Sequence, residues 1–289
     1  MAMTIRPRRS VLYMPGSNAR ALEKARVLPV DGVILDLEDA VAPEFKATAR
    51  DQVTAALAHG GFGRRERLVR INGEGTPWHD ADVAAVAGSG ADGIALPKVE
   101  TAQSVRRVEQ ALLAAGAPES VRLWCMIETP LGVLNARDIA AASPRLGGLV
   151  MGTSDLTVAL HAIAGRDRLP LLTSLGLCLL AARAHDLAIL DGVHLDLGDE
   201  AGFTAVCRQG REMGFDGKTL IHPRTIALAN EIFGPSAAEI ADATKIIAAG
   251  RAAAREGRGV VVVEGRLVEA LHVRDAERLL ALATAIADG

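Results

Sequence analysis

The stretch LWCMIETP, residues 123–130, decides the fold, because an apolar run stops at Glu128 and a Thr-Pro turn follows at once. The same pattern of a short apolar run bounded by turn residues recurs eight times along the chain. Such runs are typical of buried β-strands. The predicted strands are Val11–Met14, Val33–Leu37, Leu68–Ile71, Gly93–Pro97, Leu123–Ile127, Leu149–Met151, Ala188–Val193 and Thr219–Ile221.

Ala-rich amphipathic segments of helix length separate these strands. The clearest are Ala19–Val27, Lys46–Ala58, Val105–Ala115, Ser174–His185 and Phe203–Met213. A crossover between parallel strands needs a helix-sized connection, so the repeated alternation of strand and helix predicts an α/β fold, a (β/α)8 TIM barrel. An open doubly wound sheet is the alternative.

The domain organisation follows from where the eighth strand ends. We expect residues 1–234 to form the barrel and 235–289 a C-terminal extension of helices and a hairpin. Ser236–Glu256 opens with a Ser-Ala-Ala-Glu capping pattern that predicts a helix, and Arg274–Asp288 predicts another. Between them lies the apolar run Val260–Val263. The extension either plugs one end of the barrel or forms a lid over a site.

Composition excludes several classes of function. Hydrophobic residues make up 49% of the 289 residues and aromatic residues only 3%, which suits a core of aliphatic parallel strands. The 35 acidic and 32 basic residues give a net charge of -3, which lacks the basic footprint of a nucleic-acid binder. The sequence contains no GxxxxGK[ST] or GxSxG motif, and its GxGxxG match, GSGADG at 88–93, precedes a predicted strand instead of following one, so dinucleotide, P-loop and serine-hydrolase chemistry have no support.

Cysteine usage and hydropathy indicate the compartment. Cys125, Cys178 and Cys207 are far apart and form no CxxC pair, so neither a disulfide framework nor a zinc site is expected. No apolar run reaches the length of a signal peptide near the N-terminus or the roughly 20 residues of a membrane span. We therefore expect a cytoplasmic protein.

Polar residues gather where the predicted strands end, the place where barrel enzymes carry their reacting groups. Glu128 and Asp155 follow the fifth and sixth strands. Adjacent strands lie about 5 Å apart, so the two carboxylates could share one cation. Magnesium prefers such oxygen ligands and keeps several waters. The alternative is that each residue caps a helix N-terminus.

Arg70 ends the third strand and offers a planar, permanently charged fork for a carboxylate or a developing oxyanion. The alternative is a salt bridge within the cluster of Asp36, Glu38 and Asp39. Both hold together if Glu38 orients Arg70, which would give Glu38 a share in catalysis. For Lys98, after the fourth strand, we favour hydrogen bonding or packing over a Schiff base.

The motifs at these strand ends resemble the citrate lyase beta-subunit-like family, which includes malyl-CoA, citramalyl-CoA and citryl-CoA lyases within the wider HpcH/HpaI aldolase group. The likeness covers nearly the whole chain in order. It is carried by RSVLYMPG (9–16), ILDLEDAV (34–41), RING (70–73), IETP (127–130), GTSDL (152–156), GFDGK (214–218) and IHP (221–223).

The resemblance implies a TIM barrel with a C-terminal lid, assembled as a homotrimer or a dimer of trimers, with the lid contributed to a neighbouring subunit. It implies Mg2+ as the cofactor, Glu128 and Asp155 as its ligands, and Arg70 as the residue that binds the substrate oxygen or carboxylate. The family reaction is reversible Claisen cleavage of a 3-hydroxyacyl-CoA to an acyl-CoA and a keto acid.

The resemblance also implies a CoA-thioester substrate. Its CoA would lie near the Pro15-Gly16 turn and the basic residues Arg20 and Lys24. Gly152, which follows the sixth strand, would allow the backbone to approach the substrate closely.

One position departs from the lyases. Their lid carries an acidic residue, typically Asp, as the acid/base, and this chain has Glu269 there. One extra methylene moves the carboxylate by roughly an ångström, enough to cost about a hundredfold in rate. The lid therefore resembles a branch that hydrolyses malyl-CoA. Carbon–carbon cleavage is our main hypothesis, a (3S)-malyl-CoA thioesterase is the alternative, and a carrier-dependent or non-catalytic lyase subunit is a further one.

Overall fold

The structure is a computed structural model that describes residues 5–163 and 165–288. Its chain divides into two compact units, which are described separately. The larger is Arg8–Asn230, and the smaller joins the N-terminal residues up to Pro7 to the segment from Glu231 onward. Among the described residues, no helix combines the length and the apolarity needed to cross a bilayer.

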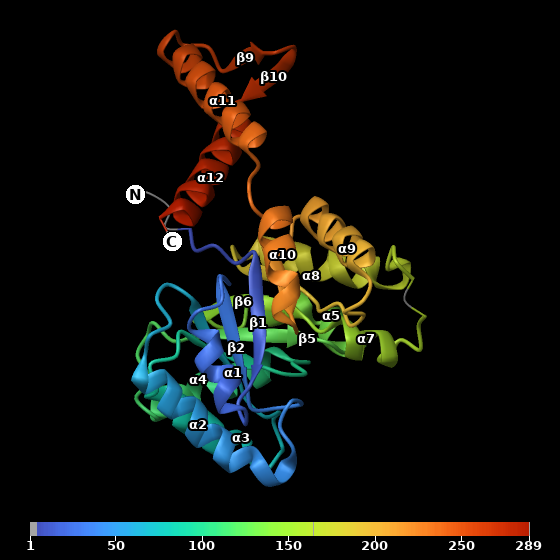
Figure 1. Cartoon of the computed structure of the whole chain (residues 1–289). Coiled ribbons are helices and arrows are strands. Elements are labelled where there is room, and N and C mark those ends of the chain that lie inside the picture. The colour runs from blue at the N-terminus through green and yellow to red at the C-terminus, as the bar shows by residue number, and fades with distance from the viewer. Residues whose placement is uncertain (1–4, 164, 289) are drawn as a thin grey trace. The chain divides into compact units, whose positions relative to one another are not determined.

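The larger unit is a closed barrel of parallel strands in chain order, as Figure 1 shows. The last strand pairs with the first, with Val11 opposite Thr219, so the alternative of an open sheet is wrong and the predicted TIM barrel is confirmed. The barrel strands among the described residues are β1 (Ser10–Pro15), β2 (Gly32–Asp36), β3 (Glu66–Arg70), β4 (Gly93–Leu96), β5 (Arg122–Ile127), β6 (Leu146–Met151), β7 (Ala188–Asp191) and β8 (Gly217–Leu220).

Helices follow the strands and surround the barrel (Figure 1). Side-chain caps start several of them: Thr101 accepts a hydrogen bond from Ser104 at the start of α4, and Asp199 accepts one from Gly202 at the start of α9. The helices from the first strand onward are α1 (Ala19–Ala25), α2 (Lys46–His59), α3 (His79–Ala87), α4 (Ala102–Ala114), α5 (Pro130–Leu134), α6 (Ala136–Ala140), α7 (Thr153–Ala159), α8 (Leu172–Ala184), α9 (Glu200–Met213) and α10 (Ile226–Phe233), with short 3-10 turns at Pro43–Phe45, Leu169–Leu171 and Pro223–Thr225.

The barrel interior contains a cluster of apolar side chains contributed by strands β1 to β7. Every second residue of a strand faces the same side, so a strand that places one apolar residue inside also places the residue two positions later inside. The buried cluster that results is Val11, Ile34, Leu68, Ala95, Trp124, Met126, Val150 and Leu190.

The same alternation carries polar residues to the mouth of the barrel. Two positions after Ile34, Leu68 and Met126 come Asp36, Arg70 and Glu128, all at least nine-tenths buried. The apolar layer thus sets which strand-end residues point inward. These three become the polar layer at the carboxyl ends of β2, β3 and β5.

The smaller unit contains two long helices and a hairpin. The helices are α11 (Ala237–Arg255) and α12 (Ala270–Ala287), and the antiparallel strands are β9 (Val260–Val263) and β10 (Arg266–Glu269). Ser236 and Glu239 form the predicted capping box of α11. Ala243 and Ile247 of α11 pack against Ala276 of α12. The boundary between 234 and 235 and the roles of lid or plug remain predictions.

Candidate active site

Glu128 is the most buried carboxylate at the mouth among the predicted site residues. It follows β5 directly and is only 1% exposed. Its Oε1 accepts a hydrogen bond of 2.7 Å from the backbone N–H of Lys98. Burial, the largest cause, raises the pKa of Glu128 to about 7; the hydrogen bond from Lys98 opposes this, and the negative charge of Glu38 adds to it. A nearby cation would stabilise the charged form of this buried carboxylate.

Asp155 lies in the first turn of α7, after β6, and is exposed. Strands β5 and β6 are paired, with Ile127 opposite Met151, as the sequence predicted. The negative charge of Asp155 also raises the pKa of Glu128, so the two carboxylates act on one another electrostatically. A divalent cation would relieve this repulsion.

The donor set fits magnesium. Among the described residues, no group of three or more His, Cys, Asp or Glu side chains is arranged to hold a metal ion. Two carboxylates, with water and substrate filling the other positions, are what a magnesium site usually offers. The residues that could hold the ion are therefore Glu128 and Asp155.

Helix capping does not account for Glu128. The cap of α5 is Thr129, whose side chain accepts a hydrogen bond from the backbone N–H of Gly132. At α7 the capping position is Gly152, with no side-chain cap bond. Asp155 lies three residues further on, within the first turn, where its charge favours the helix without capping it.

Gly152 lies directly against Glu128. A Cβ atom on Gly152 would overlap the Cβ and Oε2 atoms of Glu128, so any other residue would force the carboxylate to move. The close approach leaves Oε2 beside the backbone that connects β6 to Asp155. The predicted substrate-binding role of Gly152 remains a prediction; the structure gives it a steric role.

Arg70 lies among acidic residues. Its Nε and NH2 groups donate to the two carboxylate oxygens of Asp36 over 2.7 and 2.6 Å, and its NH1 group lies 2.9 Å from Oε2 of Glu38. A third contact, 3.3 Å to Asp39, is the longest, and the Asp39 side chain is 61% exposed. The guanidinium also stacks on Tyr13, 5.0 Å from the ring centre. The predicted salt bridge therefore exists, and Glu38 does contact Arg70.

These contacts fix the orientation of the Arg70 guanidinium and leave it able to bind a substrate oxygen. Burial alone would lower its pKa, and the hydrogen bonds and charges of Asp36 and Glu38 outweigh that and raise it. The bidentate pair with Asp36 sets the plane of the guanidinium. The exposed Asp39 is the partner that an incoming oxygen of a substrate could replace.

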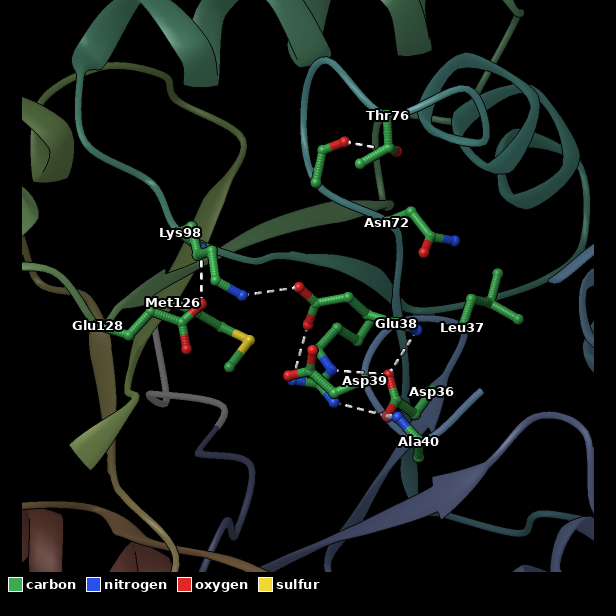
Figure 2. Close-up of polar contacts among 12 residues, drawn as sticks. Asp36, Leu37, Glu38, Asp39, Ala40, Asn72, Thr76, Lys98, Met126 and Glu128 are labelled. Carbon is green, nitrogen blue, oxygen red and sulfur yellow. Dashed lines mark hydrogen bonds and ion pairs between the residues drawn. The ribbon is translucent and has the colours of Figure 1, made fainter. Parts of the chain in front are cut away.

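Lys98 lies between Glu128 and Glu38, as Figure 2 shows. Its Nζ donates to Oε1 of Glu38 over 3.1 Å. Burial lowers the pKa of Lys98, but the charge of Glu38 outweighs this and raises it, so the side chain stays an ammonium ion. This agrees with the hydrogen-bonding role favoured for Lys98 over a Schiff base, which needs a neutral amine.

A cavity of about 790 Å³ opens beside this cluster. It is wide enough for a small-molecule ligand. Its lining includes Glu38, Asn72, Thr76, Trp78, Lys98 and Arg107.

The residues predicted to lie near CoA occupy the start of the barrel. Pro15 ends β1, and the N–H of Gly16 donates to the carbonyl of Asp36 over 2.8 Å, which ties this turn to β2. Arg20 and Lys24 are exposed and one helical turn apart on α1. Their proposed contact with CoA is not tested by this geometry.

Glu269 belongs to the smaller unit, at the junction of β10 and α12. Its backbone N–H donates to Nδ1 of His272 over 3.0 Å, and its side chain is partly exposed. The local structure holds the start of α12 in place. A catalytic role for Glu269 remains a prediction.

Two contributors to the cluster are absent from the predicted site. The sequence predicts Asp36 only as a partner of Arg70, and it predicts no role for Tyr13. Both face inward because they lie two positions after Ile34 and Val11. The alternation of each strand is the signal that could have identified them.

Comparisons with known proteins establish the family. Residues 9–223 match the family model of HpcH/HpaI aldolase/citrate lyase. The chain belongs to this family. The (3S)-malyl-CoA thioesterase of Cereibacter sphaeroides is 54% identical over 287 residues, covering 99% of this chain and 98% of the relative. The citrate lyase subunit beta of Escherichia coli is 39% identical, covering 91% and 89%.

Among solved structures, the protein CitE from Mycobacterium tuberculosis in complex with magnesium, acetoacetate and coenzyme A matches with a TM-score of 0.77 and 31% identity, covering 95% of this chain and 97% of CitE. The resemblance drawn from the motifs, the barrel and the prediction of an enzyme are thus confirmed. The relatives favour the thioesterase alternative over our main hypothesis of carbon–carbon cleavage.

Proposed function

We propose that this protein is a magnesium-dependent hydrolase of a malyl-CoA type thioester. The observation that carries the proposal is the 54% identity to a (3S)-malyl-CoA thioesterase over 99% of this chain. Glu269, in place of the Asp typical of the lyase lid, supports hydrolysis as well.

In this proposal Glu128 and Asp155 hold Mg2+. The raised pKa of Glu128, caused first by burial and increased by Asp155, supports this assignment because a bound cation would stabilise the charged form of the carboxylate. The structure of a relative, CitE, in complex with magnesium supports the choice of ion. When bound, the ion polarises a substrate oxygen as a Lewis acid.

The protein's own residues then position and stabilise the reacting groups. Arg70 donates to the oxyanion that forms when water adds to the thioester carbonyl, and Asp36 with Glu38 keeps its guanidinium in plane. The substrate oxygen takes the position of the exposed Asp39 carboxylate beside Arg70.

Hydrolysis breaks the carbon–sulfur bond. Water adds to the carbonyl carbon, its proton passes to a carboxylate base, and sulfur leaves as the CoA thiolate with malate as the other product. We assign the base to Glu269, contributed by the C-terminal lid of a neighbouring subunit in a homotrimer or hexamer. The barrel is residues 1–234 and the lid 235–289 in this proposal.

The CoA moiety binds near Pro15 and Gly16 in this proposal. Arg20 and Lys24 are exposed, basic and one turn apart on α1, which suits phosphate groups. A cytoplasmic location is supported by Cys125, Cys178 and Cys207, all of them buried and unpaired within the described residues.

Reversible Claisen cleavage is the second candidate. It is favoured by the 39% identity to a citrate lyase subunit beta, and the same barrel residues would serve it. The name of that relative also keeps open a subunit that works on a carrier-bound thioester.

One experiment separates these functions. Purified protein is incubated with malyl-CoA and Mg2+, and free thiol and glyoxylate are assayed in parallel. Hydrolysis gives thiol without glyoxylate. Glyoxylate without thiol would contradict hydrolysis and support cleavage, and the absence of both products would favour the carrier-dependent subunit.

A further inference from the structure

Lys98 has an unusual backbone for its residue type. Its φ is 49°, in the left-handed region that few residues other than glycine adopt. Such a conformation is strained for a residue with a side chain, and it persists where surrounding contacts hold it. The contacts made by the backbone and the side chain of Lys98 therefore have to stabilise this conformation.

The turn at Lys98 interrupts the pairing of β4 with β5. Leu96 is the last residue of β4, and Val99 returns to pair its N–H with the carbonyl of Met126 over 3.2 Å. In between, the N–H of Lys98 is released from the ladder and donates to Glu128 instead, over 2.7 Å. The left-handed conformation of Lys98 thus directs its backbone N–H to the side chain of Glu128 instead of to a backbone carbonyl of the neighbouring strand.

The side chain of the same residue points to the other half of the site. Its Nζ donates to Oε1 of Glu38 over 3.1 Å (Figure 2). Oε2 of Glu38 in turn lies 2.9 Å from NH1 of Arg70. Glu38 is thereby held from both sides. One residue joins the carboxylate expected to bind the metal to the guanidinium expected to bind the substrate.

We infer that Lys98 is a positioning residue with two separable effects: its strained backbone orients Glu128 for the metal, and its ammonium orients Glu38 and so Arg70 for the substrate. The inference rests on the proposed function and deepens it. It predicts that changes to the backbone conformation alter metal binding, whereas loss of the ammonium group alters turnover.

Two substitutions separate these effects. Lys98→Asn removes the ammonium and keeps a residue that tolerates the left-handed region, whereas Lys98→Val removes the ammonium and disfavours that region. Lys98→Thr is a milder β-branched version of the Val change if the Val variant does not fold. Lys98→Arg restores a cation. Asp186, with φ 53° in an exposed turn before β7, provides Asp186→Val as a control with the same backbone strain elsewhere.

The first measurement is calorimetric titration with Mg2+ alone, without substrate. We expect Lys98→Asn and Asp186→Val to bind within about twofold of the unchanged protein, and Lys98→Val or Lys98→Thr to bind about tenfold more weakly, as for loss of a group that orients a metal ligand. Equal affinity of the Asn, Thr and Val variants would overturn the backbone effect. If the unchanged protein bound no Mg2+, the proposed metal site would fail first, and the inference with it.

The second measurement is steady-state kinetics at saturating Mg2+. We expect Lys98→Asn to lower kcat about tenfold with KM nearly unchanged, and Lys98→Arg to recover most of that loss. A Lys98→Asn variant with unchanged kcat would overturn the side-chain effect. Failure of the unchanged protein to release thiol from malyl-CoA would instead contradict the proposed hydrolysis while leaving the metal titration as a test of Lys98.

Discussion

Gly152 touches Glu128 so closely that a methyl group on Gly152 would occupy the space of the carboxylate. The contact joins the two strands whose ends carry the predicted metal ligands, because Gly152 precedes α7 and Glu128 follows β5. The position of Glu128 therefore depends on the absence of a side chain on the neighbouring strand.

Gly152→Ala should displace the Glu128 carboxylate, weaken Mg2+ binding and lower turnover at least tenfold, since mispositioning by about 1 Å is costly in an active site. Calorimetry with Mg2+ and thiol release from malyl-CoA measure the two effects. Gly176→Ala is the matched control, because Gly176 lies in α8 with no atom close to an added methyl. Its activity should match that of the unchanged protein. A fully active Gly152→Ala variant would contradict this account of Glu128.

The raised pKa of Glu128 predicts a pH dependence of stability in the absence of metal. Its folded-state pKa of about 7 lies above the ordinary value of 4.5, because burial disfavours the charged form. The stability contributed by the protonated form is fully present below pH 4.5 and is lost as the pH rises to about 7. Urea unfolding in EDTA between pH 4 and 8 should thus show the unchanged protein losing stability relative to Glu128→Gln.

Mg2+ gives the complementary test of the same carboxylate. Above pH 7, where Glu128 is ionised, added Mg2+ should stabilise the unchanged protein but not Glu128→Gln. Parallel stability curves for the two proteins in EDTA would show that Glu128 does not titrate as its burial requires. Glu128→Ala should also abolish thiol release.

Arg70→Lys should lower kcat about a hundredfold, because an ammonium cannot form the bidentate pair with Asp36 that fixes the plane of the guanidinium. Arg67→Lys is a control on the same strand. Arg67 also binds a carboxylate in bidentate fashion, that of Asp92 over 3.0 and 3.1 Å, but it lies near the start of β3, three residues before Arg70. Equal kinetic losses in the two variants would point to a general loss of stability.

Glu269→Asp tests the proposed base. Shortening the side chain restores the residue typical of the lyase lid, so the ratio of glyoxylate to thiol formed from malyl-CoA should rise. Glu277→Asp on α12, which pairs with Arg251 over 2.9 Å, makes the same chemical change within the smaller unit and should leave the ratio unaltered. An unchanged ratio in Glu269→Asp would remove the lid residue from the account of product choice.

The sequence predicts most barrel strands to within one or two residues, because their apolar runs end in polar turns. The prediction of a strand boundary is wrong where glycine, a residue typical of turns, lies inside a strand. Strand β6 begins at Leu146, earlier than the predicted Leu149, since Gly147 and Gly148 are strand residues. A side chain on Gly148 would overlap the buried ring of Trp124, so this glycine serves packing inside the barrel.

The candidate site is only partly predictable. Strand ends point to Glu128, Asp155 and Arg70, since each follows an apolar run. The pairing of Arg70 with Asp36 depends on which face of each strand is inside, and the donation from Lys98 depends on a left-handed backbone. Neither property is visible in residue order alone. The choice between hydrolysis and cleavage depended on relatives.

The seam between β1 and β8 has a consequence for biosynthesis. Ser10 lies opposite Lys218, so one edge of the first barrel strand finds its partner only after more than two hundred further residues have been translated. Until then that edge presents unpaired amides and carbonyls, a template for association with other chains. We therefore expect nascent chains that stop before Gly217 to be held by chaperones, and release to coincide with emergence of the eighth strand.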